Sequence, residues 1–344
     1  AVARLSGGPG VAAVTAGPGV TNTITALKNA QLAQSPVLVL GGATGTVLKG
    51  RGALQDIDQM ALVAPHVKWA TSVARVRDLE PAVQKALDLA QSGVPGPVFV
   101  ECPLDLLYDE GLVRDMYGAK AAQGRSRSLG ERVLAAYLHR HVNQLFEGAQ
   151  DVEVSEPVAS SAPSPSGREI RRAASYLGAA RRPVLMVGSQ ALLENGRVGE
   201  LATAVERLGI PVYLSGMARG LLGANHPLQL RHQRRKALRQ ADLVLLAGVP
   251  CDFRLDYGRQ ISGKARLISV NRSAVEVSKN RRPSLGAVAD PGLFLVRLAQ
   301  REMAANAWSD WLSTLRERDL EREREIARHA EATTEHLNPI SFLR

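Results

Sequence analysis

Short apolar runs alternate with helix-like segments along most of the chain, and this alternation limits the possible folds more than any other feature. The runs at 11–14, 36–40 and 97–100 are rich in β-branched residues and bounded by glycine or proline, which predicts strands buried on both faces. Between them, residues 20–34 and 79–91 carry apolar side chains at helical spacing. Strand, helix, strand in this order predicts a mostly parallel sheet covered by helices.

The same alternation begins again after a stretch rich in serine, proline and acidic residues at 151–167, which is typical of a solvated linker. The elements predicted beyond it are, in chain order, helix 169–178, strand 183–187, helix 198–208 and strands 212–214, 241–247 and 266–270. We therefore predict an α/β protein with two parallel-sheet, Rossmann-like units.

The last forty residues differ from the rest. Trp308, Trp311, Leu312 and Leu315 follow helical spacing and precede a run of mixed charge, which predicts a long surface helix over 306–332. We interpret the charged run as a solvated face, with an interaction helix as the alternative. Residues 338–344 resemble the opening turn of another helix.

Composition excludes several classes of protein. With 344 residues, 45% of them hydrophobic, 31 glycines without a period and two cysteines, the chain is neither disordered, collagen-like nor a disulfide scaffold. No run of about 18 apolar residues occurs, and the seven histidines lack metal-ligand spacing. The net charge of +10 admits a polyanionic partner, but the 4% aromatic content argues against nucleic-acid binding.

The segment V-T-A-G-P-G-V-T-N-T at 14–23 follows a predicted strand and opens a predicted helix. Gly17 and Gly19 allow a sharp turn close to a ligand, and Thr21 or Asn22 could cap the helix. Such turns lie where α/β sheets bind ligands, although an isolated G-P-G is typical of an ordinary tight turn. The motif matches neither of the common nucleotide-phosphate loops.

Further segments follow in a recognisable order: P-V-L-V-L-G-G at 36–42, A-L-Q-D at 53–56, V-K-W at 67–69 and G-V-P-G-P-V-F-V-E-C-P at 93–103. Together with the G-P-G turn they resemble the pyrimidine-binding domain of thiamine diphosphate enzymes of the acetolactate synthase type. R-P-V-L-M-V-G-S at 182–189, A-D-L-V-L-L-A-G at 241–248 and I-S-V-N at 268–271 resemble the central, Rossmann-like domain of the same enzymes.

The resemblance implies a division of the chain into four parts. Residues 1–117 would be the C-terminal part of the pyrimidine-binding domain, 118–167 a linker and 168–302 the central, nucleotide-binding-like domain. Residues 303–344 would be a linker helix toward a diphosphate-binding domain outside the chain.

The same resemblance implies cofactor contacts. Gly17, Pro18, Gly19, Asn22 and Gln55 would lie against the pyrimidine ring of thiamine diphosphate, where amide groups can donate and accept hydrogen bonds. The Glu that protonates this ring and the G-D-G…N segment that holds Mg²⁺ are absent, so we expect no catalytic and no metal-binding residue in this chain. We expect an inactive portion of a longer enzyme.

In the central domain the resemblance implies a nucleotide or CoA site. Its expected residues are Gly188, Ser189, Gly248, Asp252, Arg254, Asn271 and Asp290. Flavin-binding members carry an arginine where this chain has Pro250, which puts FAD in doubt. Five basic residues without an acid at 231–239 would suit CoA phosphates, or form a solvated helix face. Asn271 and Asp290 follow predicted strands and could equally cap helices.

Two departures from acetolactate synthases bear on the substrate. Leu54 and Leu104 stand where those enzymes have Phe and Lys, and loss of the cation disfavours a small 2-keto acid. The function implied is a portion of a lyase that cleaves 2-hydroxyacyl-CoA to an aldehyde and formyl-CoA. The alternatives are carboligation of 2-keto acids and a non-catalytic nucleotide-binding module. The resemblance further implies a homo-oligomer, and an endoplasmic reticulum membrane location through an anchor preceding residue 1.

Overall fold

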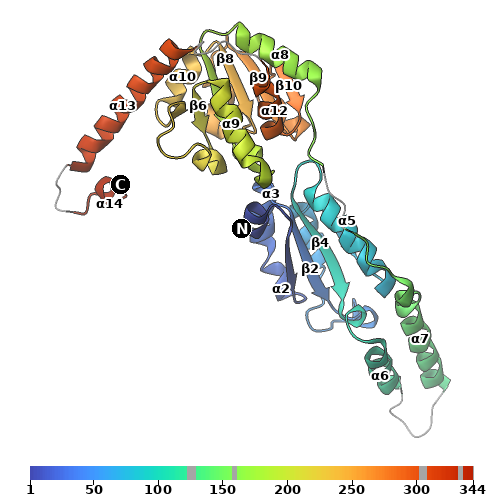
Figure 1. Cartoon of the computed structure of the whole chain (residues 1–344). Coiled ribbons are helices and arrows are strands. Elements are labelled where there is room, and N and C mark those ends of the chain that lie inside the picture. Colours follow the sequence, from blue (N-terminus) through green and yellow to red (C-terminus); the bar gives the residue numbers. More distant parts are fainter. Residues whose placement is uncertain (122–128, 157–160, 302–307, 332–335, 344) are drawn as a thin grey trace. The chain divides into compact units, whose positions relative to one another are not determined.

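Two sheets, in which every described pair of neighbouring strands runs parallel, form the centres of two units, Ala1–Ser161 and Ala162–Arg344 (Figure 1). The computed structural model describes residues 1–121, 129–156, 161–301, 308–331 and 336–343. The predicted α/β class with two parallel sheets is confirmed.

The first unit has four strands in the spatial order β1-β2-β4-β3. Its strands are β1 Gly10–Val14, β2 Val37–Ala43, β3 Trp69–Ser72 and β4 Pro97–Pro103. Its α-helices are α1 Val2–Ser6, α2 Pro18–Thr21, α3 Ile24–Leu32, α4 Gln59–Val63, α5 Leu79–Gln91, α6 Glu110–Ala121 and α7 Leu129–Phe146.

The middle strands of this sheet carry apolar side chains on both faces. Val98 packs in one cluster with Ala86 of α5, whereas Phe99 packs in another with Leu27 of α3. Successive residues of a strand point to opposite faces, so helices cover both sides of the sheet. β4 is accordingly buried along its whole length.

Strand β1 differs from its prediction. We expected residues 11–14 to be buried on both faces, but β1 lies at the edge of the sheet and Val11 is 60% exposed. This part of the prediction is wrong, because β-branched composition indicates membership of a sheet and not the position of the strand within it.

The helix predicted over 20–34 is two helices, α2 and α3. Pro18 opens α2, since its missing N–H is not needed at a helix start. Thr21 and Asn22 therefore stand at the C-terminal end of α2, and neither caps a helix with its side chain, contrary to our expectation. The Thr21 hydroxyl instead donates to the carbonyl of Pro18 at 3.1 Å.

The segment 118–167, predicted as a linker, contains α7, a helix of 18 residues. Leu138 and Val142 of α7 are buried against Val113 and Tyr117 of α6. This part of the prediction is wrong, because serine and proline dominate only the second half of the segment. Residues 152–156 have no regular secondary structure.

The second unit has six strands in the order β10-β9-β8-β5-β6-β7. Its strands are β5 Pro183–Val187, β6 Val212–Leu214, β7 Gln229–Leu230, β8 Leu243–Ala247, β9 Arg266–Asn271 and β10 Leu285–Val288. Its α-helices are α8 Gly167–Gly178, α9 Val198–Leu208, α10 Arg234–Gln240, α11 Ala274–Val277, α12 Pro291–Ala299, α13 Ser309–Glu331 and α14 Pro339–Phe342. The central strands β5 and β8 are completely buried.

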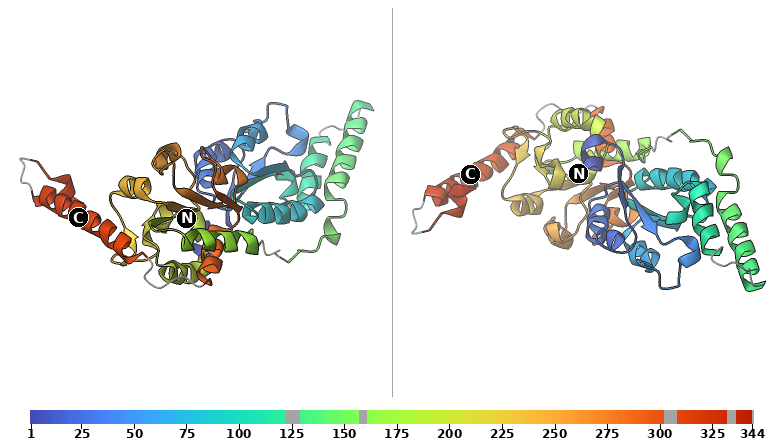
Figure 2. Two further views of the ribbon diagram at one scale, coloured as in Figure 1. Left: turned by 90° about the horizontal axis from the view of Figure 1, so that it is seen from above. Right: turned by 90° about the horizontal axis from the view of Figure 1, so that it is seen from below.

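Helix α13 is anchored to the second unit by its first turns. Trp311 and Leu315 are buried in the main core, and the Trp311 indole N–H donates to the carbonyl of Pro183 at 3.0 Å. The C-terminal part of α13 projects away from its sheet (Figure 2). Of the predicted helix 306–332, both ends lie outside the described residues. Among the described residues, no helix combines the length and apolar character needed to cross a membrane.

Candidate functional sites

The G-P-G turn joins β1 to α2 and lies against Gln55. Gly17 has a φ of +62°, which glycine adopts without strain. A Cβ atom on Gly17 would lie 3.0 Å from the Cβ and 3.2 Å from the Cα of Gln55, so a side chain would not fit. Gln55 itself has a φ of +65° and is exposed. The structure thus brings two predicted parts of one site into contact, and their role toward a cofactor stays a prediction.

The other predicted residues of this turn differ in their exposure and packing. Pro18 and Asn22 lie at the two ends of α2, and both are exposed. Gly19 approaches Thr15 so closely that a Cβ would lie 2.5 Å from the threonine hydroxyl. Gly19 is therefore explained by close packing within the turn.

A buried amide holds the turn in place. Gln59, at the start of α4, is 2% exposed. Its Nε2 donates to the carbonyl of Gly42 at 2.8 Å, and its Oε1 accepts from the N–H of Gly17 at 3.2 Å. Gln59 thereby ties the G-P-G turn to the end of β2. Sequence reasoning missed this residue, because nothing in the local pattern separates a buried glutamine from an exposed one.

An apolar cleft of about 710 Å³ opens at the carboxyl ends of β1, β2 and β4. Its lining is Ala13, Val14, Thr15, Ala16, Leu40, Gly42, Ala43, Thr44, Gly45, Leu48, Ala53, Leu54, Gln55, Cys102, Leu104 and Leu107. No charged side chain occurs among these described residues. Burial, and then the charge of Glu101, raises the pKa of the Cys102 thiol, so this thiol is protonated near neutral pH. The cleft suits an apolar ligand that Gln55 can orient by hydrogen bonds.

A buried carboxylate lies next to this cleft. Glu101 of β4 is 2% exposed and accepts hydrogen bonds from the Ser72 hydroxyl at 2.6 Å and from Lys49 Nζ at 2.9 Å. Burial by itself raises the pKa of Glu101, but hydrogen bonds from Ser72, Lys49 and Gln59 outweigh it, so the pKa is lowered. Glu101 follows Val100 in an apolar run, and this was the one signal in the sequence that could have singled it out.

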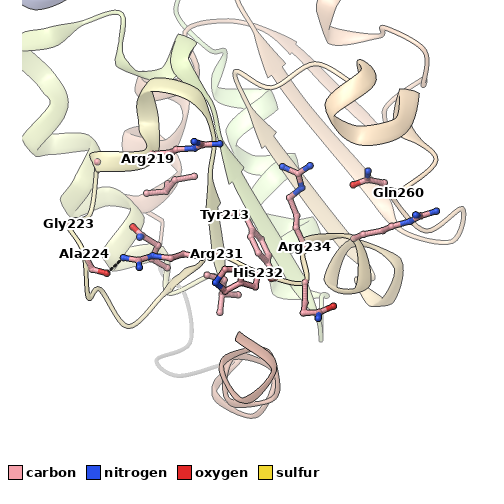
Figure 3. Close-up of a pocket in the computed structure, with 14 residues that line it drawn as sticks. Tyr213, Arg219, Gly223, Ala224, Arg231, His232, Arg234 and Gln260 are labelled. Atoms are coloured by element: carbon pink, nitrogen blue, oxygen red, sulfur yellow. Dashed lines mark hydrogen bonds between the residues drawn. The ribbon is translucent and has the colours of Figure 1, made fainter. Parts of the chain in front are cut away.

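A second, cationic cleft of about 900 Å³ lies in the second unit (Figure 3). Its lining comes from β6, β7, the loops that follow them, the start of α10 and Gln260, which lies between β8 and β9. Four arginines contribute to it, Arg219, Arg231, Arg234 and Arg235, and no acidic residue is among the described residues that line it. The basic cluster predicted at 231–239 thus places three arginines at a cleft. Arg219 is an addition that sequence reasoning missed.

The arginines influence one another. Burial, and then the nearby charges of Arg254 and Arg219, lower the pKa of Arg234, although Tyr213 acts in the opposite direction. Arg234 Nη2 donates to the carbonyl of Arg254 at 2.6 Å. Guanidinium groups that share a cleft without an acid favour a bound anion, because an anion relieves their mutual repulsion.

Arg254 itself is neutralised by a neighbour. Its Nε and Nη2 donate to both carboxylate oxygens of Asp252 at 2.6–3.0 Å. Burial raises the pKa of Asp252, but the hydrogen bonds from Arg254 outweigh it and lower the pKa. The hydrogen bond to Asp252 correspondingly raises the pKa of Arg254. The carbonyl of Arg254 accepts a hydrogen bond from the cleft residue Arg234, but Arg254 itself does not line the cleft.

The remaining predicted residues of the central domain cluster at the ends of neighbouring strands. A Cβ on Gly188 would lie 2.4 Å from the carbonyl oxygen of Gly248, whose φ is +71°. The Ser189 hydroxyl accepts from the N–H of Met217 at 3.0 Å. None of these residues lines the cationic cleft.

Asn271 and Asp290 are buried and bonded internally. Asn271 Oδ1 accepts from Gln190 Nε2 at 3.0 Å and from the N–H of Ser273 at 2.9 Å. Asp290 caps α12 through the N–H of Leu293 at 2.7 Å and pairs with Arg272 at 2.8 Å. Asp290 thus caps a helix, as the alternative interpretation expected, whereas Ser273 and not Asn271 caps α11. A role of either residue toward a nucleotide stays a prediction.

Within the described residues, no group of three or more His, Cys, Asp or Glu side chains is placed to hold a metal ion. Cys251 is buried, and burial raises the pKa of its thiol, in agreement with a small apolar core residue.

Two models of known protein families match this chain. Residues 1–62 match the model "Thiamine pyrophosphate enzyme, N-terminal TPP binding domain", and residues 170–298 match "Thiamine pyrophosphate enzyme, central domain". The chain belongs to the thiamine pyrophosphate enzymes. The predicted resemblance is confirmed, thiamine pyrophosphate being another name for thiamine diphosphate. One of the two matches lies in each unit of the chain.

The relatives narrow the family further. The chain is 45% identical to 2-hydroxyacyl-CoA lyase 2 of Danio rerio and 46% identical to that of Homo sapiens, over its whole length and over 56% and 55% of theirs. It is 34% identical to the acetolactate synthase large subunit IlvG of Mycobacterium tuberculosis, over 77% of this chain and 42% of that one. The chain thus spans about half the length of the curated relatives that it matches.

A solved structure agrees in fold. An enzyme from Mycobacterium smegmatis, described as a putative thiamin diphosphate-dependent enzyme, superposes with a TM-score of 0.63 at 20% identity. The match covers 87% of this chain and 51% of that one. At this identity the likeness concerns the fold alone.

Proposed function

We propose that this chain is part of a thiamine diphosphate-dependent lyase that cleaves 2-hydroxyacyl-CoA to an aldehyde and formyl-CoA. The observation that carries the proposal is the cationic cleft, because CoA brings several phosphate charges and the cleft holds four arginines without an acid among its described lining residues. The names of the relatives that match the whole chain support the same substrate class.

The residues of the first unit fit one end of the cofactor. The contact between Gly17 and Gln55 leaves backbone and amide groups beside a cleft with apolar walls, which suits a flat heterocycle with polar edges. When bound, thiamine diphosphate supplies the electron sink that C–C cleavage requires. The Gln55 amide would orient the pyrimidine ring, with Pro18 and Asn22 nearby on α2. The apolar walls would exclude water from it.

The lining of the apolar cleft also bears on the class of substrate. Leu54 and Leu104 both line this cleft, and none of its described lining residues is a cation that could bind the carboxylate of a small 2-keto acid. This observation favours the lyase over acetolactate synthase-type carboligation, which the mycobacterial relatives represent. A nucleotide-binding module without catalysis would need only the cationic cleft, and the family membership of the first unit argues against it.

Further parts of the proposal rest on the resemblance stated above. Mg²⁺ would hold the diphosphate through ligands in the part of the relatives that this chain does not span, and the catalytic Glu would likewise come from there. The complete enzyme would be a homo-oligomer at the endoplasmic reticulum membrane. FAD is not proposed, since Pro250 replaces the arginine of flavin-binding members.

The experiment that tests the proposal is a calorimetric titration of the chain with CoA, ADP and FAD. We expect saturable binding of CoA, weakened about tenfold or more in Arg234→Ala, because a charge-assisted hydrogen bond contributes about 1.5–3 kcal/mol. Arg239→Ala is the matched control: Arg239 belongs to the same basic cluster but is exposed and does not line the cleft. Equal loss in both variants, or tight binding of FAD with none of CoA, would contradict the proposal.

A further inference from the structure

Two acidic side chains of helix α13 contact residues that line the cationic cleft, without lining the cleft themselves. Asp319 Oδ1 accepts from the backbone N–H of Arg231 at 3.0 Å and from that of His232 at 2.6 Å. One turn later, Glu323 Oε1 lies 2.7 Å from Nε2 of His232. These carboxylates lie in the mixed-charge run interpreted above as a solvated face. At Asp319 and Glu323 that interpretation is wrong, because the partners come from a loop about 90 residues earlier in the chain.

His232, one of these two cleft residues, is also held from the side of the sheet. The hydroxyl of Tyr213, on β6, donates to the carbonyl of His232 at 3.1 Å. Backbone groups of the 231–232 segment are thus fixed by β6 on one side and by α13 on the other. Figure 3 shows the side chain of Arg234 near Tyr213, whereas the side chain of Arg231 extends toward Ala224, to whose carbonyl its Nη2 donates.

The anchoring of α13 makes Asp319 a fixed point. Trp311 and Leu315 are buried in the core, two turns and one turn before Asp319, and the Trp311 N–H is bonded to the backbone of β5. A carboxylate on so short and rigid an extension of the core has little freedom to move. The two N–H groups that it accepts are therefore held in one place relative to the sheet.

We propose that Asp319 is a positioning residue for the phosphate-bearing ligand of the cationic cleft: it holds the backbone of Arg231 and His232 and so fixes the segment that brings Arg231 and Arg234 to the lining of the cleft. The inference rests on the proposed function, since it assumes that the cleft binds phosphate groups. It concerns a residue of α13 that does not itself line the cleft.

Asp319 has two opposite effects on the binding of an anion in the cleft. As a negative charge near a cationic cleft, Asp319 repels an anionic ligand, so removing it should strengthen anion binding. As an acceptor for two backbone N–H groups it orders the arginines, so removing it should weaken binding. Under the proposal the second effect is larger.

The test compares Asp319→Ala with Asp319→Asn in titrations of the chain with CoA and inorganic pyrophosphate. Asparagine keeps a carbonyl oxygen that can accept both N–H groups but carries no charge. We expect about tenfold weaker binding in Asp319→Ala, and binding as tight as wild type or tighter in Asp319→Asn. Glu321→Ala is the control, because Glu321 is an exposed acid on the same helix that lies outside the cleft lining. We expect its binding to stay within twofold of wild type.

Hydrogen exchange of the Arg231 and His232 amides gives an independent reading of the same variants. Exchange at both amides should accelerate about tenfold in Asp319→Ala and stay slow in Asp319→Asn and Glu321→Ala. Unchanged or tighter anion binding by Asp319→Ala, equal weakening in Asp319→Asn, or unchanged exchange would overturn the proposal. If wild type bound neither CoA nor pyrophosphate, the proposed function would fail, and faster exchange would then show only a structural contact.

Discussion

Two glutamines four residues apart have opposite environments in the first unit. Gln55 is exposed beside the apolar cleft, whereas Gln59 is buried and bonded to Gly17 and Gly42. The first is available to a ligand, and the second holds the backbone that shapes the site. Substitution of each residue therefore separates binding from stability.

We predict that Gln59→Ala lowers the free energy of unfolding by about 2–4 kcal/mol, because it leaves a buried carbonyl and a buried N–H without partners and opens a cavity. Gln55→Ala should change it by less than about 0.5 kcal/mol, since an exposed side chain is lost. Urea unfolding followed by circular dichroism measures both. Equal effects of the two substitutions would show that Gln59 does not hold the turn.

The two glutamines also show how far sequence reasoning reaches at this scale. Gln55 is singled out by its place in A-L-Q-D, the stretch that resembles A-F-Q-E of acetolactate synthases. Gln59 and Glu101 gain their roles from partners on other strands and loops, and even the apolar run around Glu101 does not show which residues those partners are. Asn271 and Asp290 follow strands, as ligand-binding residues often do, but in the structure both form hydrogen bonds with other residues of the chain.

Composition predicts which segments form strands, but it does not predict where a strand lies in its sheet or which helices pack together. The apolar runs at 183–187, 212–214 and 241–247 form strands of the second sheet, and the central ones are buried as expected. The edge position of β1, the two-residue strand β7 and the pairing of α6 with α7 depend on contacts between distant segments. In α13 the apolar stripe is readable from the sequence, whereas the partner of Asp319 is not.

We predict that Trp311→Ala lowers the free energy of unfolding by about 3–5 kcal/mol, because a buried aromatic side chain and its hydrogen bond to Pro183 are lost together. Leu320→Ala on the same helix serves as the control: Leu320 is 55% exposed, and its loss should cost less than about 0.5 kcal/mol. Thermal or urea unfolding compares the two. A small effect of Trp311→Ala would mean that α13 is not part of the core.

For the whole molecule, the net charge is +10, and the basic residues lie partly together at one cleft and partly dispersed over the surface. Four arginines meet at one cleft, while other basic residues pair with acids on the surface, such as Arg197 with Glu200 and Arg322 with Glu325. Such surface pairs contribute about 0–1 kcal/mol each. The charge therefore concerns ligand binding at one place and has little influence on the fold.

The response of stability to acid follows from Glu101. Its pKa in the folded chain lies below the ordinary value of 4.5, so its contribution to stability is fully present above that value and is lost as the pH falls through the folded pKa. We predict that wild type is more stable than Glu101→Gln at pH 7, and that the difference shrinks below about pH 4.5. Urea unfolding between pH 7 and pH 4 tests this. A difference that grows toward acid would have the wrong sign.

The backbone of Gln55 has one more consequence. Its left-handed conformation costs a residue with a side chain roughly 1–2 kcal/mol, which a glycine would avoid. A chain that merely needed a turn here would be served better by glycine. The presence of glutamine implies that its amide contributes to ligand binding. Gln55→Gly should therefore raise the free energy of unfolding and weaken the binding of the ligand that the amide contacts.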